Sequence, residues 1–382
     1  MRRVLVESSY GSIWRELMEG ITFYVRAQRT GWHLHSVTTE EIARGLERKV
    51  DGLMCLLPRS RGELIEAVRK SRVPAVNMLR DATPELPSVL SDHEAIGERG
   101  AEYLLEKGYR RFGFVGVDRD WSAGRWRGFS RRLKASGRSA VLMEFPLAGV
   151  EERVGNSGAL MRTLRGGLDR LGAPGAVMAC ADFVSRAVLD ACGREPKLRV
   201  PEDVAILGVD NDAAICELTA VTLSSVPQNL ARIGFEAARL LDGLMKKRRR
   251  PREALRILPR EVVVRRSTEA IAVEDEQVAA ALRMIHESEA ADLTMKRVVE
   301  RVGVSRQWLD RRFKEVLGRT PSEEIRQRKL KEARKLLSQT SLTVQEVAMR
   351  CGFTQGENLS RFFNDWLGMS PSEFRKRYGA QL

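Results

Sequence analysis

The sequence predicts an α/β domain followed by an all-α domain, and three observations support this prediction. From residue 1 to about 266, short β-branched runs alternate with amphipathic stretches of helical length, as in a parallel sheet with crossover helices. After Val262–Ser267 the strand patterns stop, and from Asp275 onward the pattern is helical. Within this helical part, one motif occurs twice. We therefore expect one domain at residues 1–268 and a second at residues 275–382 of this 382-residue chain.

In the α/β part, the alternation defines the expected elements in chain order. The pattern fits one large sheet as well as two Rossmann-like lobes, and it does not choose between them. The expected strands are Val4–Ser8, Trp32–Val37, Gly52–Leu57, Ala75–Met78, Phe112–Val117, Ala140–Phe145, Ala176–Ala179 and Val204–Val209. The expected helices include Gly11–Arg29, His93–Lys107, Arg125–Ser136 and Phe183–Cys192.

Composition narrows the class of protein. Hydrophobic residues make up 43% and charged residues 30% of the chain, which is typical of a globular protein and excludes disorder and collagen-like repeats. The net charge of +14 favours a polyanionic partner such as nucleic acid. The basic run Lys246–Arg252 is better explained as a solvated surface loop than as a DNA contact.

Several function classes lack their motifs. The five cysteines are scattered, without CxxC or His spacing, so we expect reduced thiols and neither a disulfide framework nor a metal site. A phosphate-binding loop, HExxH and GxSxG are all missing, so we expect no enzyme activity and no cofactor. There is no signal-peptide core and no apolar run of membrane-spanning length, so we expect a cytoplasmic protein with no membrane partner.

The duplicated motif has the pattern of a helix-turn-helix. Each copy has a Thr that can cap a first helix, then a Gly for the turn, then a second helix with one apolar stripe. An ordinary helical bundle is the alternative, but a bundle needs no repeated turn spacing. Thr294, Val298, Gly303 and Ser305 recur as Thr343, Val347, Gly352 and Thr354, and after one inserted residue Leu309, Arg311, Phe313, Leu317, Gly318 and Pro321 recur as Leu359, Arg361, Phe363, Leu367, Gly368 and Pro371.

The second helix of each copy is expected to bury its apolar stripe and to leave a polar face near its N-terminus free. Recognition helices meet base edges and phosphates with such a face. The buried stripes are expected to be Leu309, Phe313, Val316 and Leu317 in the first copy, and Leu359, Phe363, Trp366 and Leu367 in the second. The free faces present Arg306, Gln307, Asp310 and Arg311 in the first copy, and Gly356, Glu357, Asn358 and Arg361 in the second.

Roughly residues 275–380 resemble the DNA-binding domain of the AraC/XylS family, on Trp308–Gly318 with Pro321 and on Val347–Phe353 with Phe362–Arg375. The resemblance implies two recognition helices in successive major-groove segments of double-stranded DNA, about 34 Å apart. By motif position, the implied base readers are Arg306, Gln307 and Arg311 in the first helix and Glu357, Asn358 and Arg361 in the second.

The first part of the chain resembles LacI-type sugar-binding cores, which have a periplasmic-binding-protein fold with two lobes closing over a ligand. The resemblance lies in Leu90–Gly97, Leu104–Gly116, Arg125–Phe129, Val200–Asp212 and Leu223–Gln228. Joined to an AraC-type domain, this core is similar to bacterial pentose-responsive activators. The combination implies a xylose-like sugar ligand, a homodimer formed through the α/β domain, and contact with RNA polymerase.

Ligands of such folds lie at the carboxyl ends of strands. By motif, Arg125 is expected to donate to sugar hydroxyls, while Asp182 and Asp210 accept from them. Alternatively, Arg125 pairs with Asp118 or Asp120 on a surface loop, and Asp182 caps the helix Phe183–Cys192. Ala181 stands where such cores normally have Asn, which leaves the identity of the ligand open. Further candidate ligand contacts are Ser9, Tyr10, Trp14 and Trp126, with Trp121 as a second ring that can stack on a sugar.

Two other function classes use a similar DNA-binding module. A response regulator requires an acidic pair at the end of the first strand, but Val4–Ser8 ends in Glu-Ser-Ser, and the α/β part is long for one receiver domain. An alkyl-transfer repair protein requires an activated acceptor Cys, and none of the cysteines in the α/β part has a neighbouring His or Glu in a recognisable motif. The sequence therefore predicts a sugar-responsive transcription regulator.

Overall fold

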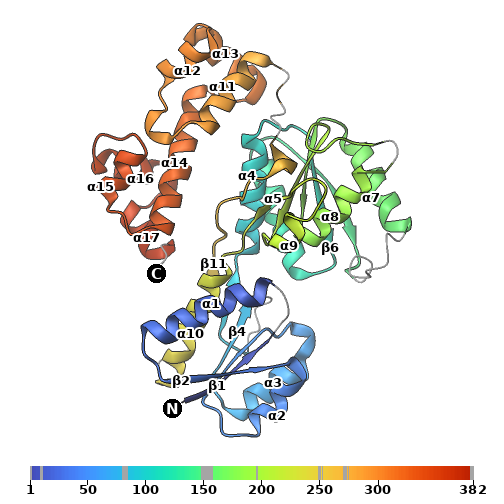
Figure 1. Cartoon of the computed structure of the whole chain (residues 1–382), viewed down its shortest axis with the longest axis vertical. Coiled ribbons are helices and arrows are strands. Elements are labelled where there is room, and N and C mark those ends of the chain that lie inside the picture. Colours follow the sequence, from blue (N-terminus) through green and yellow to red (C-terminus); the bar gives the residue numbers. More distant parts are fainter. Residues whose placement is uncertain are drawn as a thin grey trace. The chain divides into compact units, whose positions relative to one another are not determined.

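The computed structural model describes residues 2–8, 12–79, 85–147, 158–194, 197–247, 251, 253–269, 273 and 275–378. The chain divides into two compact units, one of residues 1–103 and 111–269 and the other of residues 104–110 and 270–382. The first unit is α/β and the second is all-α, so the predicted fold class is confirmed. The α/β unit has two lobes, each built on its own parallel sheet, which decides against one large sheet (Figure 1).

The first lobe has a six-stranded sheet with the order β11-β5-β4-β3-β1-β2. Neighbouring residues of β1 face opposite sides, so that Val4 and Val6 pack in the core with α1 and α10, whereas Leu5 packs with α2 and α3 (Figure 1). The strands are β1 (Arg2–Glu7), β2 (Trp32–Val37), β3 (Gly52–Cys55), β4 (Ala75–Leu79), β5 (Ser88–Ser91) and β11 (Leu255–Ile257), and the helices are α1 (Ser12–Ala27), α2 (Ile42–Leu46), α3 (Gly62–Ser71) and α10 (Leu230–Met245).

Two glycines let α1 and α10 approach closely. A Cβ atom at Gly20 would lie 1.8 Å from the backbone oxygen of Ala231, and one at Gly234 would lie 2.1 Å from that of Leu17. No real Cβ contact is this short, so the two helices can cross at this distance only without side chains at these positions.

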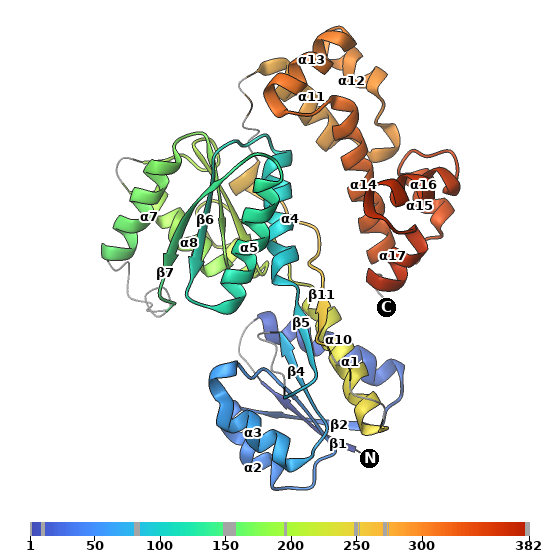
Figure 2. The same ribbon diagram turned by 180° about the vertical axis from the view of Figure 1, so that it is seen from behind.

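The second lobe has a five-stranded sheet with the order β10-β9-β8-β6-β7. Helices α4 and α5 cover one face and α7 and α8 the other (Figure 2). The chain crosses between the lobes after β5, after β10 and after β11, and Val263 pairs antiparallel with Ser225 of β10. The strands are β6 (Phe112–Val117), β7 (Ala140–Phe145), β8 (Gly175–Ala179), β9 (Val204–Val209) and β10 (Ser224–Val226), and the helices are α4 (His93–Glu106), α5 (Asp120–Lys134), α7 (Gly158–Leu171), α8 (Asp182–Cys192) and α9 (Ala213–Cys216).

The predicted bounds of β2, β6, β7 and β9 agree with the structure. The prediction missed β5, β10 and β11, because each is only three or four residues long and two of them contain serine, which is not typical of strands. Helix α5 begins at Asp120 and not at the predicted Arg125. A Cβ at Gly124, in the first turns of α5, would lie 2.9 Å from the Cβ of His93, so this glycine allows close packing against α4.

The second unit contains the two helix-turn-helix copies. One hydrophobic core joins α11 to α13 with Ile325 of α14, and another joins the rest of α14 to α15, α16 and α17. None of the helices in the described residues is long and apolar enough to cross a membrane. The helices are α11 (Glu276–Glu287), α12 (Met295–Val302), α13 (Arg306–Leu317), α14 (Pro321–Gln339), α15 (Val344–Arg350), α16 (Gly356–Leu367) and α17 (Pro371–Tyr378).

Local capping follows the prediction in the first copy. The hydroxyl of Thr294 accepts from the Arg297 N–H (3.3 Å), Ser305 accepts from the Trp308 N–H (3.2 Å), and Gly303 ends α12 at φ 75°. In the second copy Thr343 caps α15, but the inserted residue changes the next cap. Gln355 precedes α16, and the N–H of Gly356 donates to Oε1 of Gln345 instead (2.6 Å).

The expectation that Trp366 belongs to a buried stripe is wrong. Leu359 and Phe363 are fully buried in the predicted stripe, whereas Trp366 is 39% exposed. Its ring lies 6.1 Å from that of Phe362, one turn back on the same helix. Trp366 is near the last turn of α16, so the stripe runs past the edge of the small core before the helix ends.

Candidate functional site

Charged side chains gather at the carboxyl ends of the strands of the second lobe. Arg125 follows β6, Asp182 follows β8, and Asp210 follows β9. The parallel sheet carries these strand ends to a common edge, next to the crossover that leaves β10 at Gln228. The structure therefore brings together the three residues that were expected to contact a ligand.

Arg125 is almost fully buried, and its position contradicts the surface-loop alternative. Its Nη2 lies 3.6 Å from Oδ1 of Asp210, its Nη1 donates to the backbone oxygen of Cys180, and its guanidinium lies 4.8 Å from the ring centroid of Trp121. Asp118, the rejected partner, pairs with Arg119 instead. Among the described residues, Nε of Arg125 has no hydrogen-bond partner. A buried guanidinium with an unused N–H is suited to donate to a ligand oxygen.

Asp210 is the carboxylate that faces Arg125. Its side chain is 15% exposed, and its Oδ1 accepts from Nε2 of Gln228 as well as facing the guanidinium. Its φ of 110° is uncommon for a residue other than glycine and turns the chain sharply at the end of β9. Burial raises the pKa of Asp210, and the nearby Arg125 only partly opposes this rise.

Asp182 differs from Asp210 because both of its carboxylate oxygens accept hydrogen bonds from the protein. It is buried, and Oδ1 accepts from the Ser225 hydroxyl (2.7 Å), while Oδ2 accepts from the Asp212 N–H (2.8 Å) and from the Cys216 thiol (3.4 Å). Burial, with the charge of Asp210, raises its pKa to about 7. The helix-cap alternative is wrong, since Ala181 is the N-cap of α8 and Asp182 already lies within the helix. Through its hydrogen bond with the Asp212 N–H, Asp182 anchors the loop that carries Asp210.

Of the other residues expected to contact a ligand, two pack against hydrophobic side chains and two lie outside the described residues. Trp126 packs on the rings of Phe114 and Phe129, 5.5 and 6.5 Å away, and Trp14 packs against the core of the first lobe. Ser9 and Tyr10 lie outside the described residues. Trp121, beneath Arg125, is the aromatic ring that lies within the polar group.

Sequence reasoning missed polar residues that connect this group to the first lobe. Gln228 accepts a hydrogen bond from the hydroxyl of Ser91 at the end of β5 (2.6 Å) while it donates to Asp210. Glu16 of α1 lies within electrostatic reach of Arg260 and Asp210, and its burial raises its pKa. Gln228 and Ser91 stood in quoted motifs without a role, whereas no sequence pattern marked Glu16.

This arrangement suits recognition more than catalysis. Burial raises the pKa of each of the thiols considered for alkyl transfer, which is the opposite of the activation that an acceptor needs; these are Cys55, Cys180, Cys192 and Cys216. The two-lobed fold also contradicts the receiver-domain alternative. Within the described ranges, no three His, Cys, Asp or Glu side chains form a candidate metal site. A buried cation, a carboxylate and an amide beside an aromatic ring match the hydroxyls and C–H face of a sugar.

The first recognition helix, α13, presents the expected polar face. Leu309 and Phe313 are fully buried, while Arg306, Gln307 and Arg311 are exposed. The side chain of Arg306 is 66% exposed and that of Arg311 is 71% exposed, and each is only 3.7–3.9 Å from a carboxylate one turn further on. Such exposed ion pairs stabilise little, so neither arginine is held in place by its carboxylate partner.

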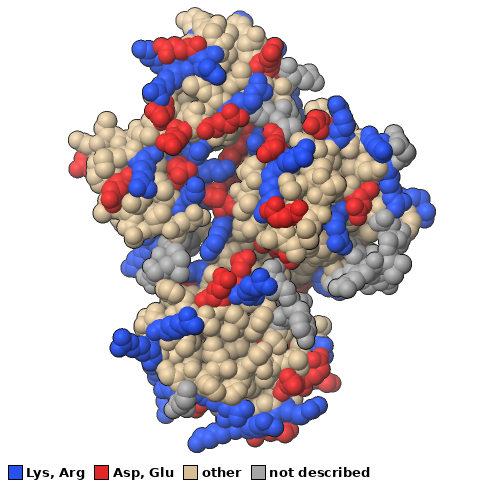
Figure 3. Space-filling view, viewed as in Figure 1, with Lys and Arg blue, Asp and Glu red and all other residues tan. Residues whose placement is uncertain are grey.

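In α16, the second recognition helix, the expected readers Glu357, Asn358 and Arg361 are likewise exposed. Nδ2 of Asn358 donates to the hydroxyl of Thr354 (3.1 Å), which orients its amide near the start of the helix. On the face drawn in Figure 3, Lys and Arg side chains alternate with Asp and Glu side chains on both the α/β part and the helical part. The net charge therefore does not by itself locate the DNA-binding surface.

Two family models match the chain, one in the later part of the α/β unit and one in the helical unit. A periplasmic binding protein-like domain matches residues 101–268, and a helix-turn-helix domain matches residues 298–377. The xylose operon regulatory protein of Escherichia coli K12 is 28% identical over 375 residues, covering 94% of this chain and 93% of that protein. Its counterpart in Haemophilus influenzae is 26% identical over 378 residues, with 94% of each chain covered.

Solved structures agree with the fold of both parts. The structure of the xylose-binding transcription activator XylR is 26% identical, has a TM-score of 0.61, and covers 99% of this chain and 98% of that one. The complex of the transcriptional regulator CelR with cellobiose is 23% identical, has a TM-score of 0.56, and covers 69% of this chain and 84% of that one. The second likeness concerns the fold of the α/β unit alone.

Proposed function

This chain is a homologue of the xylose operon regulatory proteins, a transcription regulator with a periplasmic-binding-protein-like domain and an AraC-type helix-turn-helix domain, and we propose that its ligand is a pentose, D-xylose first. The observation that carries the ligand proposal is the buried Arg125–Asp210 pair at the strand ends, next to Gln228. The relatives are transcription regulators, and this chain is not an enzyme.

The geometry of the pair suits a sugar hydroxyl. At 3.6 Å, Nη2 of Arg125 and Oδ1 of Asp210 are farther apart than in a good charge-assisted hydrogen bond. A hydroxyl can accept from the guanidinium and donate to the carboxylate at the same time. Hydrogen bonds to charged groups contribute about 1.5–3 kcal/mol each, so these two side chains can dominate specificity. Trp121 supplies an apolar face beside them.

In this proposal the ligand lies between the two lobes. Gln228 connects Asp210 to Ser91 at the end of β5 in the first lobe, so we expect a ligand at Asp210 to contact both lobes. Ligand binding shifts the balance between two states of the α/β domain only to the extent that it binds one of them more tightly. Asp182 and Trp126 then act as supports of the site, although both were expected to contact ligand.

Several features of the regulator belong to the proposal. We place the domains at residues 1–268 and 275–382, with the six readers Arg306, Gln307, Arg311, Glu357, Asn358 and Arg361 in successive major-groove segments. The protein works in the cytoplasm as a homodimer formed through the α/β domain, and it activates transcription by contact with RNA polymerase. The names of the homologous proteins, a regulator of a xylose operon and a xylose-binding activator, support the proposed ligand and the role in activation.

Thermal unfolding in the presence of sugars tests the ligand assignment. At about 100 times its dissociation constant, a ligand of the folded state stabilises it by about 2.7 kcal/mol. We expect D-xylose to raise the unfolding temperature more than L-arabinose, D-ribose or D-glucose does. The matched control is the Arg125→Met variant, which keeps the apolar volume but cannot donate. If no sugar changes the transition of the wild type, the ligand class is wrong while the DNA-binding assignment stands.

A further inference from the structure

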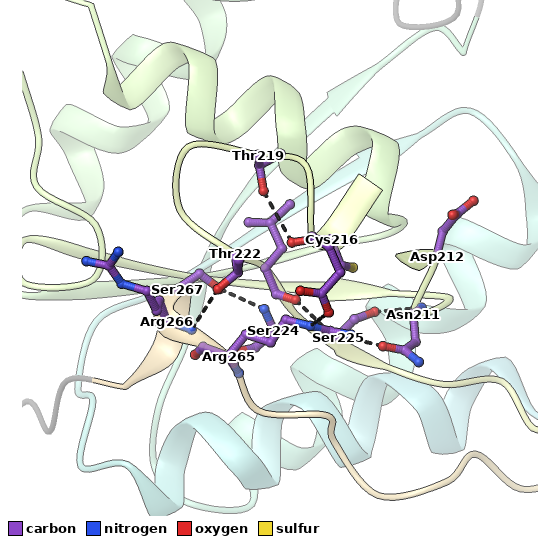
Figure 4. A network of polar contacts seen from close by, with 12 residues as sticks. Asn211, Asp212, Cys216, Thr219, Thr222, Ser224, Ser225, Arg265, Arg266 and Ser267 are labelled. Carbon is purple, nitrogen blue, oxygen red and sulfur yellow. Dashed lines mark hydrogen bonds and ion pairs between the residues drawn. The ribbon is translucent and has the colours of Figure 1, made fainter. Parts of the chain in front are cut away.

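Arg265 connects the loop of Asp210 to the segment that leaves the α/β unit. Its Nη1 donates to Oδ1 of Asn211 (3.0 Å) (Figure 4). The same Nη1 donates to the backbone oxygen of Leu223 (3.0 Å), and Nε donates to Oε1 of Glu217 (2.6 Å). The side chain is only 14% exposed. Asn211 directly follows Asp210 in the chain, so the guanidinium of Arg265 contacts the loop that carries Asp210.

The loop itself is held at defined points. Asn211 has a φ of 59°, and its N–H donates to the hydroxyl of Ser225 (2.9 Å), which in turn donates to Asp182. The N–H of Asp212 donates to the same carboxylate. The backbone of the loop is therefore anchored to β10 and to Asp182, and the Asn211 side chain is the group that contacts Arg265.

The segment that follows Arg265 is fixed by buried hydroxyl groups. The N–H of Arg265 donates to Oγ of Ser224 (2.8 Å) (Figure 4). This Oγ lies 2.6 Å from the hydroxyl of Thr268, and Ser267 donates to the backbone oxygen of Ile206 (2.6 Å). Tyr103 reaches the same Thr268 hydroxyl (2.7 Å). The chain then continues to Asp275, the N-cap of the first helix of the DNA-binding unit.

We propose that Arg265 is a positioning residue through which ligand binding at Asp210 is transmitted to the segment leading into the DNA-binding unit. The proposal rests on the proposed function, because it needs a ligand at this loop. A ligand that takes up the carboxylate of Asp210 changes the loop around the neighbouring Asn211. Because Arg265 is hydrogen-bonded to this amide, its side chain moves when the amide moves. The backbone of Arg265 is the start of the segment 265–268. A buried guanidinium with fixed partners transmits such a shift, because close packing leaves few alternative arrangements.

Neighbouring contacts offer a matched set of variants. Arg265→Lys keeps the positive charge beside Glu217 but loses the planar fork that reaches Asn211 and Leu223. Asn211→Gly removes the amide and tolerates the positive φ, whereas Asn211→Asp retains an acceptor at the same position. Glu217→Ala is the control, because it removes the exposed partner of Arg265 and leaves the loop untouched.

The experiment measures two affinities in the full-length protein. Calorimetry gives the dissociation constant for D-xylose, and a gel-shift titration gives the affinity for a promoter fragment selected by the wild type, with and without sugar. The ratio of the two DNA affinities is the coupling factor, which is typically about 5–150-fold. We expect Arg265→Lys and Asn211→Gly to reduce this factor to below about 2-fold, with sugar affinity within about 3-fold of the wild type.

The controls and the combined variant decide the role. Asn211→Asp and Glu217→Ala should keep the wild-type factor, and the Arg265→Lys, Asn211→Gly double variant should be no worse than either single one, because both act on the same link. The proposal is overturned if both single variants keep the wild-type factor, or if they lose the factor only together with sugar affinity. If the wild type itself shows no sugar binding, the proposed function fails, and this result is distinct from either outcome.

Discussion

Replacing Asp210 by Asn should weaken sugar binding without weakening the folded protein. The substitution is close to isosteric, and Asn tolerates the positive φ of 110° at this position. Its amide oxygen can still accept from Gln228, so the loop keeps this anchor. What changes is the charge that faces Arg125 and the acceptor offered to the ligand.

The structure sets the sign of each effect. At 3.6 Å and an effective dielectric constant of about 20, the attraction between Arg125 and Asp210 is about 4–5 kcal/mol. Nevertheless the pKa of Asp210 is raised, because the loss of hydration on burial outweighs this attraction. We therefore expect the free energy of unfolding to stay the same or rise. Sugar binding should lose one charge-assisted hydrogen bond, about 1.5–3 kcal/mol, which is roughly a 10- to 150-fold weaker affinity.

Calorimetric titration with D-xylose and urea unfolding without sugar measure the two quantities separately. The control is Asp169→Asn, which changes a carboxylate of the same lobe whose side chain is 59% exposed, and should alter neither quantity. Sugar affinity within threefold of the wild type would refute the assignment of Asp210, and a large loss of stability would refute the account of its burial.

The remaining predictions concern DNA binding, pH and packing. Arg311→Ala should weaken binding to the selected promoter fragment by about 1–3 kcal/mol and leave sugar affinity unchanged, and a gel-shift titration that matches the wild type would remove Arg311 from the readers. Because the pKa of Asp182 is raised to about 7, its proton is lost on unfolding, so the free energy of unfolding should fall as pH rises from about 4 to about 7. Asp182→Asn should abolish this component, and urea titrations at about pH 5 and about pH 8 would contradict it if both proteins lost equal stability. Gly20→Ala should cost about 1–3 kcal/mol in thermal unfolding, because its Cβ would lie 1.8 Å from the Ala231 oxygen, whereas Gly166→Ala, with no atom nearer than 4.0 Å, should not destabilise α7.

Predictions succeeded where the determining chemistry is local in the chain. The caps Thr294, Ser305 and Thr343 each bond to a backbone N–H three residues further on, so the helix starts could be predicted from the sequence. The long buried strands of the α/β unit were likewise visible as apolar runs. Short strands such as β10 were not predicted, because three residues show no periodicity and their pairing depends on partners elsewhere in the chain.

By itself, the sequence determined the two-part architecture, the duplicated helix-turn-helix and the strand ends at which a ligand site would lie. Only the tertiary structure decided which polar residue at those strand ends is bound by other protein groups and which one faces Arg125. Asp182 and Asp210 both follow a parallel strand. The Ser225 hydroxyl and the Asp212 N–H donate to the carboxylate of Asp182, whereas the carboxylate of Asp210 faces Arg125. These partners lie far from one another in the sequence and meet only when the sheet brings the strand ends together. The energy of a buried charge depends on those neighbours, and neighbours are set by the fold.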